Sequence, residues 1–159
     1  MPVQTTYEKN QMPAFEGQRA NLGLINIISK VVEGKGIPFG RAVVRGTADN
    51  QVKLPSKSGQ YFMGVTEMTT AWTENSDGVY LYEEFREANI IDFGMVCAYT
   101  EQAVVPGDSV YFRHTTKKSS DIAGRFRRDS DDKNADKVVG ATWETTTPAG
   151  GVGQIKLRY

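Results

Sequence analysis

Apolar and polar residues alternate along much of the chain, most clearly at its C-terminal end. In the run 153–159, Ile155, Leu157 and Tyr159 alternate with polar residues, which is the pattern of a strand with one buried face. Runs rich in β-branched and aromatic residues, as is typical of strands, also occur at 24–33, 37–45, 60–68, 79–82, 90–99, 109–114, 122–127 and 137–144. The pattern therefore predicts eight or more short strands.

Clusters of turn-forming residues separate these runs, at 34–36, 55–59, 75–78, 106–108 and 147–151. Short strands joined by such turns predict an all-β fold, either a β-barrel or a jelly-roll-like sandwich of short antiparallel strands. Positions 24, 27, 28 and 31 also fit a helical stripe, so that run keeps a helical alternative. The stretch 82–89 could form two helical turns at most, which is too short to be stable without packing.

The first 22 residues differ in pattern from the rest of the chain. They contain Pro13, Gly17 and isolated bulky residues such as Tyr7 and Phe15, without a sustained period of two or of 3.6. We predict an extended N-terminal arm at 1–22 and a β-barrel or jelly-roll-like domain at 23–159. The aromatic residues of an arm need a partner, either this domain or another subunit; the alternative is a frayed terminus without a role.

Composition narrows the class of protein. The chain has 159 residues, enough for one domain with a real core, and 19 acidic residues balance 19 basic ones. This balance gives no overall field toward nucleic acid or an anionic membrane. No apolar run approaches the roughly 20 residues that span a bilayer, and the N-terminus lacks the features of a secretory signal. Cys97 is the only cysteine, so we expect no internal disulfide, a buried inert thiol, and a soluble protein made in a reducing cytoplasm.

The sequence offers little that could support catalysis. One histidine, His114, and one cysteine cannot form a usual zinc site, and no nucleophile elbow is present. The glycines at 34–40 lead into a strand-like run and do not have the dinucleotide-binding spacing. The acidic stretch 129–136 lacks the glycine and the glutamate of a calcium loop, which favours a solvated loop. We predict no enzyme, no metal and no cofactor, with His114 as a surface residue.

Two adjacent blocks of opposite charge stand out. Residues 113–128 contain six basic residues and one aspartate, whereas residues 129–136 contain four aspartates and one lysine. The blocks could form a hairpin that pairs with itself, a self-complementary contact between subunits, or a nucleic-acid groove with Tyr111, Phe112 and Phe126 as stacking partners. The acidic block counts against the third explanation. The candidate contact residues in these blocks are Arg113, Arg125, Arg127, Asp131 and Asp132.

The run 102–113, Gln-Ala-Val-Val-Pro-Gly-Asp-Ser-Val-Tyr-Phe-Arg, resembles the "EAVxPGDPVYF" segment of the cement, or head decoration, proteins of tailed bacteriophages. Further matching segments follow in the same order as in that family, so the resemblance covers nearly the whole chain: 5–7 with Pro13-Ala14 and Gly17, 37–43 with 45–47, 62–66, and 140–145 before Gly150-Gly151. The chain departs from the pattern at Ser109, where proline is common, and in its longer, more charged 113–136 segment.

This resemblance implies a β-barrel or jelly-roll-like domain that binds the outer surface of the mature head. Such proteins bridge neighbouring major capsid protein subunits and stabilise the shell. The resemblance also implies a homo-oligomer, with a homodimer preferred and a homotrimer as the alternative, and an arm that reaches the capsid or a neighbour. We expect the protein on the virion surface after synthesis in the host cytoplasm, with no nucleic-acid or membrane partner.

Interface statistics favour Tyr7, Phe15 and Arg19 as contacts made by the arm, because aromatic residues and arginine most often anchor interfaces. Trp72 is a further candidate, with a core tryptophan under a loop as its alternative. Two other functions stay open at this point: a carbohydrate- or nucleic-acid-binding β-module on the virion that uses Trp72 or the basic block, and a small hydrolase that uses His114.

Overall fold

The computed structural model describes residues 14–70, 73–74 and 78–158. The described residues contain strands and turns but no helix, and so no helix that could cross a membrane. The strands are β1 (Asn26–Val32), β2 (Ile37–Pro38), β3 (Ala42–Arg45), β4 (Gln51–Lys53), β5 (Phe62–Thr66), β6 (Thr73–Glu74), β7 (Tyr80–Tyr82), β8 (Glu87–Tyr99), β9 (Ser109–Arg113), β10 (Phe126–Arg127), β11 (Ala135–Trp143) and β12 (Val152–Leu157).

Strand β8, with 13 residues, connects the two halves of the molecule. Its first half pairs with β1 and β5, and the sheet order β1-β4-β3-β5-β8 returns to β1, so these five strands close into a barrel. Its second half pairs with β12, from which the sheet continues through β11 and β9 to β10. A parallel bridge from Thr100 to Phe126 brings β10 back beside the chain that leaves β8.

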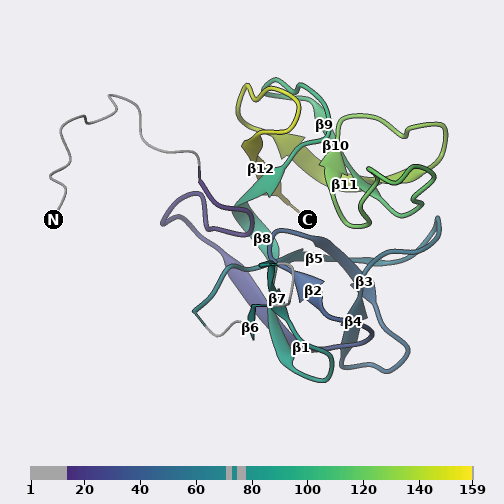
Figure 1. Cartoon of the computed structure of the whole chain (residues 1–159). Coiled ribbons are helices and arrows are strands. Elements are labelled where there is room, and N and C mark those ends of the chain that lie inside the picture. The colour runs from purple at the N-terminus through teal and green to yellow at the C-terminus, as the bar shows by residue number, and fades with distance from the viewer. Residues whose placement is uncertain (1–13, 71–72, 75–77, 159) are drawn as a thin grey trace, which may run out of the picture.

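Figure 1 shows this division, with β9 to β12 gathered at one end of the molecule, β1 to β7 at the other, and β8 running between them. We call these parts the second sheet and the first barrel. Strands β2, β7 and β6 form a separate three-stranded sheet beside the first barrel. Except for the parallel β1–β4 pair, the strand pairs are antiparallel.

The core consists of two clusters, and strand alternation divides residues between them. On β3, Ala42 and Val44 belong to the larger cluster, whereas Val43 belongs to the smaller one. On β8, Ile91 and Ile90 are divided in the same way. Successive side chains of a strand point to opposite faces, so these central strands are buried on both sides. The larger cluster includes Trp143 and extends into the second sheet.

The all-β, barrel-like fold predicted from the sequence is confirmed, and most predicted strands match. The run 24–33 contains β1, so its strand interpretation is correct. The run 37–45 is divided into β2 and β3 by a turn at Gly40, and only Phe126–Arg127 of the run 122–127 is a strand. The short strands β4 and β6 lie outside the predicted runs. The stretch 82–89 contains a tight turn and the start of β8, with no helical turn.

Candidate functional site

The second half of the predicted arm lies against β8. Gly17 donates its backbone N–H to the carbonyl of Cys97 at 2.8 Å, Cys97 donates to Gln18 at 2.8 Å, and Ala20 donates to Met95 at 3.0 Å. Since Cys97 uses both its N–H and its C=O in these bonds, the segment occupies the edge of β8 opposite β12. Residues 17–20 therefore lie along β8 as an additional strand-like segment.

Two ion pairs hold the side chains of this segment. Glu16 accepts a hydrogen bond from the buried Arg41 at 2.8 Å, and Arg19 donates to Glu67 at 2.5 Å. Burial lowers the pKa of Arg41, and Glu16 opposes that shift. Arg19 stays half exposed, and Phe15 is 63% exposed. Of the three predicted arm contacts, Phe15 and Arg19 thus present surface to solvent.

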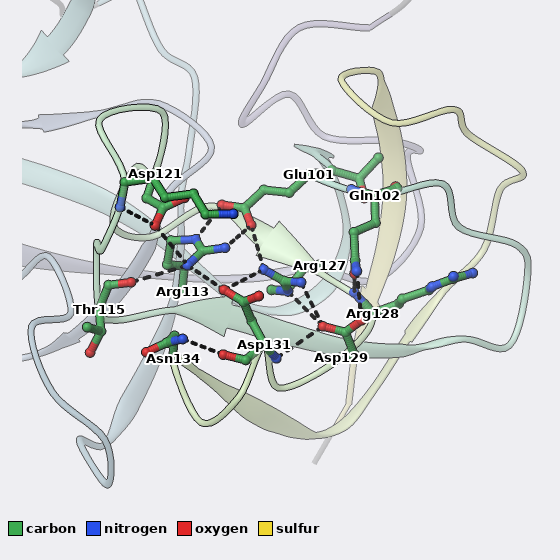
Figure 2. Close-up of polar contacts among 12 residues, drawn as sticks. Glu101, Gln102, Arg113, Thr115, Asp121, Arg127, Arg128, Asp129, Asp131 and Asn134 are labelled. Atoms are coloured by element: carbon green, nitrogen blue, oxygen red, sulfur yellow. Dashed lines mark hydrogen bonds and ion pairs between the residues drawn. The ribbon is translucent and has the colours of Figure 1, made fainter.

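The two adjacent blocks of opposite charge, residues 113–136, fold into an ion-pair network that involves two buried arginines (Figure 2). Arg113 binds Glu101 through two hydrogen bonds of 2.7 Å each, and it lies 2.8 Å from Asp131 and 3.5 Å from Asp121. Arg127 contacts Glu101 at 3.1 Å, Asp131 at 3.0 Å and Asp129 at 2.7 Å. The guanidinium groups face carboxylates of the same chain, so the self-pairing explanation describes this segment.

The network shifts the ionisation of its members. The hydrogen bonds from Arg113 to Glu101 raise the pKa of Arg113 further above its ordinary value, against the effect of burial. The backbone N–H groups of Lys118 and Lys117 lower the pKa of Asp121, with Arg113 contributing. Charge-assisted, bidentate contacts of this kind are among the strongest hydrogen bonds in proteins.

The remaining candidates in the charged blocks have different surroundings. The Arg125 guanidinium carbon lies over the Tyr99 ring, 3.8 Å from its centroid. Asp132 is exposed, so part of the acidic loop is solvated, as predicted. Asp131 is only partly exposed, because its carboxylate faces both buried arginines. Asp131, Asp132 and Lys133 all have positive φ, at 45°, 52° and 68°. Tyr7 and Trp72 lie outside the described residues.

Sequence reasoning missed Glu101, which joins Arg113 to Arg127. It lies 12 and 26 residues before its partners, outside both charged blocks, and no local pattern marks it. The prediction that His114 is a surface residue is wrong, since this side chain is 2% exposed. Its Nδ1 contacts the Thr115 hydroxyl at 2.8 Å, and its Nε2 lies 3.5 Å from Asp136. The His114 N–H also donates to the Asn134 carbonyl at 3.0 Å, and periodicity could not show these long-range contacts.

An apolar groove of about 800 Å³ lies between the first barrel and the second sheet. Its floor includes Met63 and Leu157, and its rim includes Tyr61 and Val139, which are 67% and 85% exposed. Among the described residues, no group of three or more histidine, cysteine or acidic side chains is placed to hold a metal ion. The groove and the arm segment both expose apolar side chains that could contact a partner.

Comparison with known proteins gives the setting for these surfaces. Residues 3–158 match the family model of the structural cement protein (E217 gp24/Pam3 gp6). The chain belongs to this phage cement protein family. A chain from the solved structure of the capsid of Myoviridae phage XM1 has the same fold, with a TM-score of 0.74 and 18% identity over 99% of this chain and 98% of that one. No curated protein matches the sequence. The role of the cement protein is structural, in the phage capsid.

Proposed function

We propose that this cement protein binds the outer surface of the phage head and bridges neighbouring major capsid protein subunits, which stabilises the shell. The observation that carries the proposal is the family match over residues 3–158, which includes most of the arm as well as the domain. A small domain that makes two or more contacts on a repetitive lattice gains avidity, because the second contact forms at a high effective concentration. The protein would be made in the host cytoplasm and would end on the outside of the virion.

The arm segment is our candidate for the capsid contact. Phe15 and Arg19 flank residues whose backbone is bonded to β8, namely Gly17, Gln18 and Ala20, and Gln18 also donates its N–H to the Phe15 carbonyl. Binding would therefore need to order little else. Tyr7 belongs to the same proposed contact, and Trp72 is proposed as a separate one. The buried Arg113 and Arg127 present little surface. Among the candidates in residues 113–136, Arg125 and Asp132 would therefore contact a partner.

Binding to heads that lack the cement protein tests this function. Purified protein added to such heads should bind saturably, at a fixed number of copies per shell. A Phe15→Ser variant should saturate at the same number but need at least about tenfold more protein, the effect expected of one interface anchor. Val105→Ser, which also alters an exposed apolar side chain, serves as the matched control. Absence of saturable binding to heads of its own phage would overturn the proposal.

A further inference from the structure

An exposed aromatic residue with an unfavourable backbone conformation marks the turn between β7 and β8. Phe85 is 74% exposed and has a φ of 65°, in the left-handed region that glycine prefers and bulky residues avoid. The turn is fixed, since Phe85 donates its N–H to Val32 at 2.9 Å and Val32 donates to Arg86 at 2.9 Å. Stability favours glycine here and solubility favours a polar residue, so a contact made by the ring accounts for phenylalanine.

Glutamates flank Phe85 in the sequence of the turn. Glu84 and Glu87 are exposed, and among the described residues neither has an ion-pair partner. Glu83 lies 3.8 Å from Arg86 across the turn. Residues 83–87 thus carry an exposed ring in a turn with three glutamates and one arginine, so the turn is acidic on balance. We call it the Phe85 knob.

The groove between the first barrel and the second sheet has the opposite character. Its floor and rim are mainly apolar, and its exposed charged side chains are Lys137 and Arg158, for which the described residues show no ion pair. The carboxylates in its lining are half-buried and already engaged. Asp92 accepts from Asn26 at 2.7 Å, and Asp136 accepts from Ser58 at 2.8 Å and from Gly59 at 2.7 Å.

A bulge in β11 exposes the apolar rim of this groove. The register with β9 changes from Lys137 opposite Tyr111 to Thr142 opposite Ser109, so four residues of β11 stand against one of β9. Val139 lies in this bulge and is 85% exposed. Bulges commonly redirect a side chain to a functional surface, and an exposed apolar rim beside an apolar groove marks an interaction site.

We propose that the groove of one copy receives the Phe85 knob of a second copy of this chain, with Glu84 and Glu87 of the knob facing Lys137 and Arg158 at the rim. The two surfaces are complementary in shape and in charge, since a projecting ring with acidic neighbours meets an apolar groove with basic neighbours. Repeated in both directions about a two-fold axis, the contact gives a dimer. This inference concerns self-association and does not depend on the capsid contact of the arm.

Sedimentation equilibrium of the free protein tests the contact. The full chain should sediment as more than one copy. Phe85→Gly should weaken association at least about tenfold, as expected for an interface anchor. At a concentration low enough for both chains to be monomeric, its melting temperature should stay equal or rise, because the left-handed conformation suits glycine. The double variant Lys137→Glu/Arg158→Glu should weaken association similarly. Lys117→Glu/Lys118→Glu, with the same change in charge on the exposed loop outside the groove, should not.

Charge exchange identifies the partner. Glu84→Lys/Glu87→Lys and Lys137→Glu/Arg158→Glu should each associate weakly alone, and their mixture should recover association. A monomeric wild-type chain at its highest soluble concentration, or knob and groove variants that associate like the wild type, would overturn the inference. Loss of capsid binding in the groove variant with unchanged self-association would also overturn it, by assigning the groove to the shell. Since arm variants are scored on heads and these variants in free solution, the two proposals can fail separately.

Discussion

Among single residues, Arg113 has the most demanding surroundings. Its side chain is 4% exposed and contacts Glu101, Asp121 and Asp131. Removing one partner of a buried charge group leaves the others uncompensated, which is more destabilising than losing an exposed pair.

Arg113→Met should therefore lower the free energy of unfolding by about 3 kcal/mol. Arg128→Met, at an exposed position in the same segment, should change it by less than about 0.5 kcal/mol. Urea unfolding at neutral pH measures both. Equal, small effects for the two variants would show that the network adds nothing to stability.

Acid should weaken the same region. Backbone N–H groups of Lys118 and Lys117 lower the pKa of Asp121 from its ordinary value of 3.8. A lowered folded-state pKa means that the carboxylate stabilises the fold above pH 3.8, and that this contribution is lost as the pH falls through the lower folded value. The unfolding free energy of Asp121→Asn should thus decline less steeply below about pH 4. Parallel curves for variant and wild type, from pH 6 to pH 2, would contradict the assignment.

The charged residues also show where sequence reasoning reaches its limit. Adjacent blocks of opposite sign were enough to suggest internal pairing, because sequence neighbours with opposite charges readily meet in a hairpin. Glu101 could not be assigned, since its proximity to Arg113 and Arg127 depends on how β8 ends beside β10. Burial of His114 depends in the same way on tertiary packing.

At the scale of elements, the second half of the predicted arm has partners in the described structure. Residues 17–20 make backbone hydrogen bonds to β8, and we propose that these bonds stabilise the domain. A chain lacking residues 1–20 should therefore melt at a lower temperature than the full chain, whereas a chain lacking only residues 1–13 keeps those bonds and should melt close to the full chain. Thermal unfolding by circular dichroism compares the two. Equal melting temperatures would indicate that residues 14–20 form an arm that adds nothing to the stability of the domain.

Gly17 tests the fit of this segment more locally. A Cβ at this position would lie 2.6 Å from the Thr66 carbonyl oxygen and 2.7 Å from the Gly40 nitrogen, and φ is +80°. Gly59 has a similar φ of +77°, with no atom within 4 Å of a Cβ. Gly59→Ala should cost about 1 kcal/mol for the backbone conformation alone, and Gly17→Ala should cost clearly more. Chemical denaturation measures the unfolding free energy of both variants. Equal decreases would mean that the segment around Gly17 can shift to accommodate the added Cβ without further loss of stability.

Strands with strong local patterns were predicted well, and weakly patterned ones were not. Strand β12 alternates along its whole length, and β8 and β9 contain dense apolar runs, so sequence alone placed them within a few residues. Strand β4 has one buried side chain, Val52, between two half-buried ones, and three residues carry too little periodicity to be recognised. Closure of the barrel through the β1–β8 pair is a long-range contact, for which local sequence contains no signal.

At the scale of the whole molecule, the long strand β8 belongs to both the first barrel and the second sheet and joins them into one unit. Balanced charge provides no long-range steering. The proposed attachment would therefore depend on local features, namely the exposed residues of the arm segment and the repeated geometry of a shell. The apolar groove and the Phe85 knob would connect copies to one another.

The most direct test of the cement role is the temperature at which genome-filled heads release their DNA. Heads decorated to saturation with the wild-type chain should release DNA at a higher temperature than undecorated heads. Under the proposed function each bound copy would hold neighbouring capsid subunits together, and binding to the intact shell would stabilise it. The Phe15→Ser variant should need more protein to reach the same increase. Saturated heads that release DNA at the same temperature as undecorated heads would contradict the account.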